Sequence, residues 1–272
     1  MAKVISTENI PLLDHGYLKL VEFWGSDESV ICAARMSTDG AFKGWGCWKC
    51  DTCGLELDYK QGHTSEPGVM CSNEVAFARI PRDEKLLRYL WENRHHTPFE
   101  MAGLTIEVQA PIFVFREWHR HRVPFSYNEL SARYTPLPDL NYIPTVVRLM
   151  INAGTSNKQA GTIKGAEALS VEAAQAFREN LEDMYGRAQL LYERALASGV
   201  PKELARVHLP VGRYSRMRAS ANLRGWLNFL SLRMASGAQW EIRQYANALG
   251  DVIKEIFPRT WELFAEGFKH EQ

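Results

Sequence analysis

The densest group of chemically capable side chains lies between residues 116 and 134. Its first part contains Arg120-His121-Arg122, and its second part runs from Ser126 to Tyr134 with serine, asparagine and glutamate side chains. Guanidinium groups bind phosphate oxygens through paired hydrogen bonds. Hydroxyl, amide and carboxylate groups can bind a sugar or a planar base. The pattern therefore predicts a nucleotide site.

A second interpretation is open for Arg120-His121-Arg122 taken alone. Basic residues at the end of a helix complement the negative end of the helix dipole and are often simply solvated. The polar continuation from Ser126 to Arg133 favours the nucleotide site.

Cysteine residues are crowded in another stretch of the chain. Cys47, Cys50 and Cys53 fall within seven positions, and His63 and Cys71 follow. Thiolates and imidazole at such spacing suit a tetrahedral metal site, for which we expect Cys47, Cys50, Cys53 and Cys71 as ligands. Structural zinc, an unmetallated thiol-bearing loop and an iron-sulfur cluster all remain open.

Overall charge and hydropathy limit the classes of partner. The 32 basic and 32 acidic residues cancel, so no global field would hold the chain on nucleic acid or on an anionic membrane. The start of the chain lacks the apolar run of a signal peptide, and nowhere do about 18 consecutive apolar residues occur. We expect a cytoplasmic protein that binds neither membrane nor nucleic acid.

The elements that must position these residues are a few strands among several helices, which predicts an α+β fold. We expect one catalytic domain over residues 1–272, interrupted by a Cys-rich insertion at about 38–82 that shows no regular period. Before it, residues 17–23 alternate as a strand, and Ser26 should cap a helix through Arg35. After it, Asp83 should cap a helix that Pro98 ends.

The second half of the chain contains the longest helical signals. Residues 104–108 alternate as a strand, and Pro111 can begin a helix at Ile112–His119. Helices are also predicted over 222–236 and 239–257, with Trp226, Phe229 and Trp240 as core residues. A long core helix is predicted from an apolar stripe of Phe177, Leu181, Met184, Ala188, Leu191 and Ala195.

The motifs together resemble a known family. Arg120-His121-Arg122, a short spacer and Ser131, within Ser126-Tyr127-Asn128-Glu129-Leu130-Ser131-Ala132-Arg133-Tyr134, resemble the signature of the flavin-dependent thymidylate synthases. Further blocks resemble the family in the same order: residues 95–100, Ala205-Arg206 with Leu209-Pro210, and residues 228–233 running into 238–241. The resemblance implies a mainly antiparallel sheet packed with several long helices.

The resemblance also assigns roles to residues. It implies that dUMP is bound by Glu117, Arg120, Glu129, Ser131, Ala132, Arg133, Arg206 and Arg233, and that Arg233 is catalytic because it favours ionisation of the uracil ring. It implies that FAD is held by Thr97, Arg120, His121, Arg122, Glu129, Asn222, Arg224 and Asn228. His95 would lie where folate and nicotinamide meet the flavin.

The reaction implied by the family is reductive methylation of dUMP to dTMP, with methylenetetrahydrofolate and NADPH as co-substrates and FAD as cofactor. The family builds its sites between subunits, so the resemblance implies a homotetramer.

Two departures from the family pattern leave alternatives open. The spacer from Val123 to Leu130 is one residue longer than usual, and the extra residue falls within Val123-Pro124-Phe125. Gly237 stands where many relatives carry a histidine that helps hold the flavin. A related flavin-dependent pyrimidine-nucleotide alkylase or hydroxymethylase is therefore one alternative, and a zinc-containing nucleic-acid-binding module is a more distant one.

Overall fold

A computed structural model describes residues 8–57, 63–66, 69–71, 77–151 and 169–271 of the chain. Its contacts group into two compact units, of which the first contains residues up to Phe23 and from Gly103 to Ile253. The second contains residues from Trp24 to Ala102 and from Lys254 to Glu271. The units are described one at a time, and the single domain expected over residues 1–272 stays a prediction.

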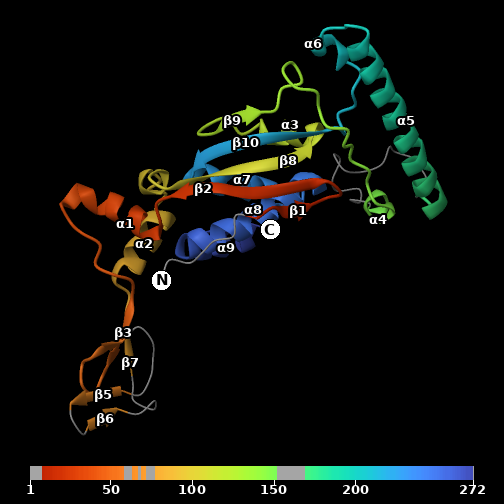
Figure 1. Cartoon of the computed structure of the whole chain (residues 1–272). Coiled ribbons are helices and arrows are strands. Elements are labelled where there is room, and N and C mark those ends of the chain that lie inside the picture. The colour runs from red at the N-terminus through yellow and green to blue at the C-terminus, as the bar shows by residue number, and fades with distance from the viewer. Residues whose placement is uncertain (1–7, 58–62, 67–68, 72–76, 152–168, 272) are drawn as a thin grey trace. The chain divides into compact units, whose positions relative to one another are not determined.

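The first unit is built on a five-stranded sheet (Figure 1). Its order is β1-β2-β8-β10-β9, where β1 is Ile10–Leu12, β2 Gly16–Trp24, β8 Gly103–Pro111, β10 Tyr214–Asn222 and β9 Ser126–Glu129. β10 runs antiparallel to both β8 and β9, with Arg218 opposite Glu107 on one side and Asn128 on the other. The mainly antiparallel α+β architecture is confirmed.

Helices α3 (Ile112–Trp118), α7 (Leu223–Arg233) and α8 (Trp240–Ile256) accompany the sheet. The indole nitrogen of Trp226 donates to the Leu104 carbonyl of β8 at 3.0 Å, and Phe229 stacks on Trp118 with ring centroids 4.4 Å apart. Trp226 and Phe229 are fully buried, which confirms them as core residues. Trp240 is only partly buried and lines a cavity, so its prediction as a core residue was wrong.

Helix α5 (Val171–Ala197) follows the short helix α4 (Val146–Met150) and precedes α6 (Lys202–Ala205). Ser170 caps it by accepting from the Ala173 amide at 3.1 Å. Its predicted core stripe is exposed in this chain. Phe177, Met184 and Leu191 keep 49%, 42% and 55% of their surface accessible to solvent. The helix was predicted correctly, but the prediction that its apolar stripe is buried in the core of the single chain was wrong.

The second unit contains α1 (Asp27–Arg35), η1 (Met36–Thr38), α2 (Arg82–Glu92), η2 (Thr97–Glu100) and α9 (Pro258–Glu271). Ser26 caps α1 as predicted, with its hydroxyl accepting from the Ser29 amide. Asp83 is not a cap, because Pro81 takes the N-cap position of α2 and Asp83 is the fully buried second residue of the helix. The helix also ends at Glu92 rather than at Pro98.

The Cys-rich insertion is more regular than its composition suggests. β3 (Cys47–Cys50) pairs with β4 (Glu56–Leu57) and with β7 (Phe77–Ile80), and β5 (His63–Glu66) pairs with β6 (Val69–Cys71). All of these strands are antiparallel and only two to four residues long, too short to show a sequence period. Within the described ranges, no helix is both long and apolar enough to span a membrane.

Candidate active site

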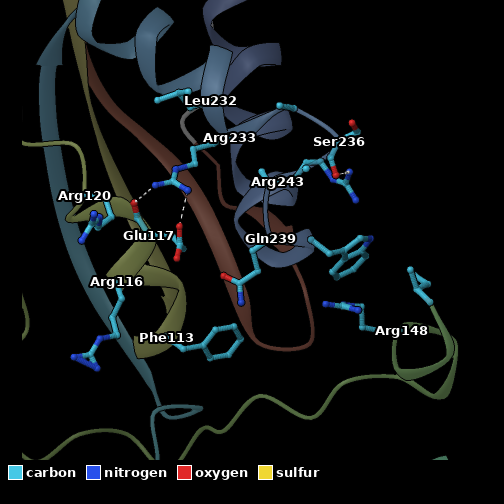
Figure 2. Close-up of a pocket in the computed structure, with 15 residues that line it drawn as sticks. Phe113, Arg116, Glu117, Arg120, Arg148, Leu232, Arg233, Ser236, Gln239 and Arg243 are labelled. Carbon is cyan, nitrogen blue, oxygen red and sulfur yellow. Dashed lines mark hydrogen bonds and ion pairs between the residues drawn. The ribbon is translucent and has the colours of Figure 1, made fainter. Parts of the chain in front are cut away.

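A cavity of about 1090 Å³ opens in the first unit between α3, α4, α7, α8 and the segment that joins α7 to α8 (Figure 2). Five arginines line it, together with a single carboxylate: Arg116, Arg120, Arg148, Arg233, Arg243 and Glu117. Such a lining favours an anionic ligand, because guanidinium groups keep their charge at any physiological pH. The cavity is large enough for a nucleotide or part of a cofactor.

Arg233, the last residue of α7, is held by two groups from or beside α3. Its Nη1 lies 2.5 Å from a carboxylate oxygen of Glu117, and its Nη2 donates to the Glu117 carbonyl at 3.0 Å. Its Nε donates to Nε2 of His121 at 2.8 Å. The predicted residues Glu117, His121 and Arg233 are therefore brought together, and the guanidinium plane is fixed by three hydrogen bonds.

His121 is neutral in this arrangement. Burial lowers its pKa, and the nearby Arg233 guanidinium lowers it further, to about 4 against an ordinary 6.5. Because Nε2 accepts from Arg233, the ring proton sits on Nδ1. The imidazole can therefore orient Arg233 without adding a second positive charge.

A titration of His121 tests this assignment. Between pH 6.5 and about 4 the unfolded chain binds a proton at this residue and the folded chain does not, so acidification through this window favours unfolding. We expect an NMR midpoint for the His121 ring near 4. A midpoint above 6 would mean that His121 is not buried against Arg233.

The longer spacer is accommodated beside the start of α7. Pro124 packs so closely on Gly225 that a Cβ there would lie 2.5 Å from the proline Cδ. Phe125 stacks on Tyr127, with centroids 5.6 Å apart, and meets Trp226 edge to face at 4.8 Å. The Tyr127 hydroxyl lies 2.8 Å from the His121 carbonyl, so the spacer supports the backbone that carries His121.

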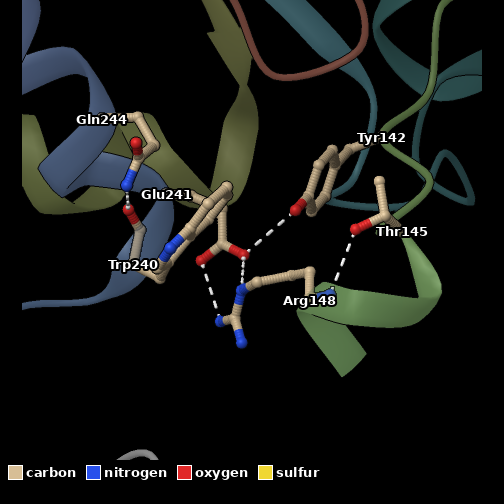
Figure 3. Close-up of polar contacts among 6 residues, drawn as sticks. All are labelled: Tyr142, Thr145, Arg148, Trp240, Glu241 and Gln244. Atoms are coloured by element: carbon tan, nitrogen blue, oxygen red, sulfur yellow. Dashed lines mark hydrogen bonds and ion pairs between the residues drawn. The ribbon is translucent and has the colours of Figure 1, made fainter. Parts of the chain in front are cut away.

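A second arginine is anchored at the other side of the cavity (Figure 3). The Nε of Arg148 donates to Glu241 at 2.7 Å, and the Tyr142 hydroxyl donates to the same carboxylate at 3.1 Å. The side chain of Glu241 is only 4% exposed. Burial and the Glu241 charge raise the pKa of Tyr142, which stays protonated and can donate.

Several residues assigned to dUMP by the resemblance do not line this cavity. The Arg133 guanidinium pairs with Glu203 at 3.2 Å on the exposed surface, and Ser131 accepts from the Arg133 amide at 3.3 Å. Arg206 follows α6 as its C-cap residue. Glu129 ends β9, and Ala132 is buried just beyond it. Of the predicted dUMP residues, only Glu117, Arg120 and Arg233 line the cavity.

The predicted FAD residues are also dispersed. Asn222 caps α7 by accepting from the Gly225 amide at 2.9 Å, and Arg224 and Asn228 lie on the same helix. Arg122 is exposed just beyond α3. His95 and Thr97 belong to the second unit. Thr97 begins η2, and His95 precedes it with its ring against that of Tyr89. Gly237 lines the cavity, and a Cβ there would meet no atom within 4 Å.

The predicted metal ligands have no complete cluster in the described part of the chain. No group of three or more potential ligands comes together there. Cys47 and Cys50 are buried and Cys53 is exposed. The Cys50–Gly54 turn is closed by a hydrogen bond from the Gly54 amide to the Cys50 carbonyl at 2.8 Å. The side chain of Cys71 lies outside the described residues.

Among the lining residues that sequence analysis did not assign to the site are Arg148, Trp240 and Arg243. Trp240 and Arg243 lie one helical turn apart on α8, beside the family block at 238–241. That spacing, next to the family block, could have indicated that both residues belong to the site. Arg148 had no such signal, because its role depends on Glu241, 93 residues away.

The chain is similar to known proteins along most of its length. Residues 19–259 match the family described as thymidylate synthase complementing protein. A flavin-dependent thymidylate synthase of Thermosipho africanus is 36% identical over 93% of this chain and 92% of its own length. One from Thermus thermophilus is 35% identical over 94% of this chain and 78% of its own length.

A solved structure extends the similarity to the fold. The UMP/dUMP methylase PolB of Streptomyces cacaoi, bound with 5-Br dUMP, aligns with a TM-score of 0.69 at 30% identity. The alignment covers 94% of this chain and 97% of that one. The motifs, the antiparallel sheet and the matches along most of the chain show that this protein belongs to the flavin-dependent thymidylate synthase family.

Proposed function

We propose that this protein is a flavin-dependent thymidylate synthase that converts dUMP to dTMP with methylenetetrahydrofolate and NADPH. The observation that carries the proposal is the Arg233 guanidinium, held by Glu117 and His121 in an arginine-lined cavity. The family match over residues 19–259 supports it.

Arg233 would act on the pyrimidine. A fixed cation beside the uracil ring lowers the pKa of the ring imide and stabilises negative charge that develops during methylation. Neutral His121 and the Glu117 carboxylate would keep the guanidinium in position while leaving one face of it for the base. Ser131, Ala132, Arg133, Arg206 and Glu129 would complete the nucleotide site.

FAD would be held by Arg120, His121, Arg122, Asn222, Arg224 and Asn228, with Thr97, Glu129 and His95. The cationic lining fits its pyrophosphate, since Arg120 faces the cavity and pairs with no carboxylate among the described residues. When bound, the flavin supplies the redox chemistry that the side chains lack. Gly237 leaves open space where a side chain could otherwise contact it.

A second candidate is methylation of UMP as well as dUMP. It is favoured by the similarity to PolB, whose described substrates are UMP and dUMP. Comparing the two nucleotides under identical conditions separates the candidates. Product from UMP at a rate similar to that from dUMP would support the broader activity.

We also propose that the active protein is a homotetramer. The exposed stripe of α5, with Phe177, Met184 and Leu191, supports burial against another chain, because a contiguous apolar stripe is costly to leave in water. The separation of Ser131, Arg133 and Arg206 from the Arg233 cavity also supports a site completed by a second subunit. A cytoplasmic location stays a prediction.

For the Cys-rich insertion we propose a structural zinc ion held by Cys50 and Cys53, with Cys47 and Cys71 as further ligands. The spacing of Cys50 and Cys53 around a tight turn, with Gly54 at a φ of +76°, supports it. Elemental analysis of protein purified with zinc present should give about one zinc per chain. It should give none for a Cys50→Ser, Cys53→Ser variant, and metal-free wild-type protein would refute the proposal.

The flavin part of the proposal is tested by visible absorbance. Protein mixed with FAD and freed of excess should retain the bands of bound oxidised flavin, and NADPH should bleach them. Retention without bleaching would point to another reductant. Protein that retains no flavin would contradict the proposed function.

A further inference from the structure

The Trp240 end of the cavity has features that the proposed reaction does not use. Arg148 from α4 and Arg243 from α8 line the cavity together with Gln239 (Figure 2). Trp240, at the start of α8, lines it as well. The Arg148 guanidinium carbon lies 5.4 Å from the centre of the Trp240 ring. One guanidinium group therefore lies over a partly exposed aromatic surface, and a second follows one turn later on α8.

Charge compensation differs between the two arginines. The Glu241 carboxylate accepts hydrogen bonds from Nε and Nη2 of Arg148 at 2.7 and 3.3 Å. This contact neutralises the charge of Arg148 and fixes the position of its guanidinium group. Arg243 donates to the Ser236 carbonyl at 3.1 Å, and no carboxylate among the described residues pairs with it. An uncompensated guanidinium in a cavity is a site for an anion.

The anchoring of Arg243 places its charge beside an open space. Ser236 immediately precedes Gly237, and a Cβ at Gly237 would meet nothing within 4 Å. The missing side chain at 237 therefore leaves room for a ligand next to Arg243. Trp240, one turn earlier on the same helix, offers that ligand an apolar surface.

We propose that Trp240, Arg243 and Arg148 form a subsite for a planar aromatic group that carries an anion, supplied by a co-substrate. The inference rests on the proposed function. Two co-substrates have this chemistry: the folate, through its aminobenzoyl ring and glutamate carboxylates, and NADPH, through its adenine and 2′-phosphate. Arg233, held by Glu117, remains the residue for the pyrimidine.

Equilibrium binding tests the subsite without relying on turnover. Calorimetry on FAD-loaded protein would measure dissociation constants for folic acid, NADP⁺ and NAD⁺. Loss of one charge-assisted hydrogen bond should weaken binding about tenfold. We expect the Arg243→Gln variant to bind its ligand about tenfold more weakly than the wild type, and the Trp240→Leu variant to show a similar weakening. The control is Lys254→Gln, which removes a positive charge from an exposed position of α8 outside the cavity lining.

The ligands separate the two sources. Weaker folic acid binding with unchanged NADP⁺ binding assigns the subsite to the folate carboxylates. Weaker NADP⁺ binding with unchanged NAD⁺ binding assigns it to the 2′-phosphate. Unchanged constants for all three ligands, or a loss confined to FAD retention, would overturn the subsite. If wild-type protein retained no flavin and made no dTMP, the proposed function itself would have failed.

Discussion

Replacing Arg233 with glutamine is expected to lower kcat/KM for dUMP by about a hundredfold or more, since one preorganised donor to a developing anion contributes roughly that much. The substitution removes the permanent charge beside the pyrimidine. It also leaves the Glu117 carboxylate, 2.5 Å from Arg233 in the wild type, without its partner. Steady-state assays of dTMP formation at varied dUMP would measure the change.

The control for this prediction separates charge from folding. Arg233→Lys keeps a cation but cannot reproduce contacts from three nitrogens to Glu117 and His121, so it should recover only part of the lost activity. Lys254→Gln, at an exposed position of α8 outside the cavity lining, should behave like the wild type. If Arg233→Gln kept activity within a few-fold of wild type and remained folded, Arg233 would not be the catalytic residue.

Replacing Asp83 with alanine is expected to lower the free energy of unfolding by about 3 kcal/mol, the usual cost of breaking a buried ion pair by removing one partner. The Asp83 side chain is 0% exposed and pairs with Arg35, itself only 17% exposed. Its second oxygen accepts from the Lys43 amide at 2.6 Å, at the beginning of the Cys-rich insertion. Thermal or denaturant unfolding would measure the loss.

Asp251→Ala is the matched control, because Asp251 is exposed on α8 and should change stability little. A double variant, Arg35→Met with Asp83→Leu, should recover part of the loss because no buried charge is left unpaired. Unfolding of Asp83→Ala at the wild-type midpoint would show that this pair does not stabilise the second unit.

Local patterns in the sequence predicted much of the fold. The apolar alternation of Leu104, Ile106 and Val108 gave β8, and all three residues are fully buried. The stripe on α8 was equally informative, since Ile242, Tyr245, Leu249 and Ile253 are completely inaccessible. These predictions succeeded because a residue's side of a strand or helix follows from its spacing.

Features that depend on distant pairs could not be predicted. Asp83 reads as a helix cap because aspartate favours that position, yet its partner Arg35 is 48 residues away. The five-arginine cavity likewise assembles side chains from α3, α4, α7 and α8. Sequence motifs identified Arg120 and Arg233, whereas Arg148 depends on the long-range contact with Glu241.

The exposed stripe of α5 shows a different limit. Its spacing correctly indicates an apolar helix face, but spacing does not say whether the face is buried within one chain or between chains. In the described part of this chain, Tyr185 and Tyr192 of α5 are the large buried side chains instead. The proposed tetramer would explain why the apolar stripe is exposed in the single chain.

The central claim is most directly tested by product analysis of flavin-free protein incubated with dUMP, methylenetetrahydrofolate and NADPH, with and without added FAD. The account predicts dTMP only in the complete mixture, and its loss when any one component is omitted. Formation of dTMP without FAD, or a different pyrimidine product in the complete mixture, would contradict the assignment as a flavin-dependent thymidylate synthase.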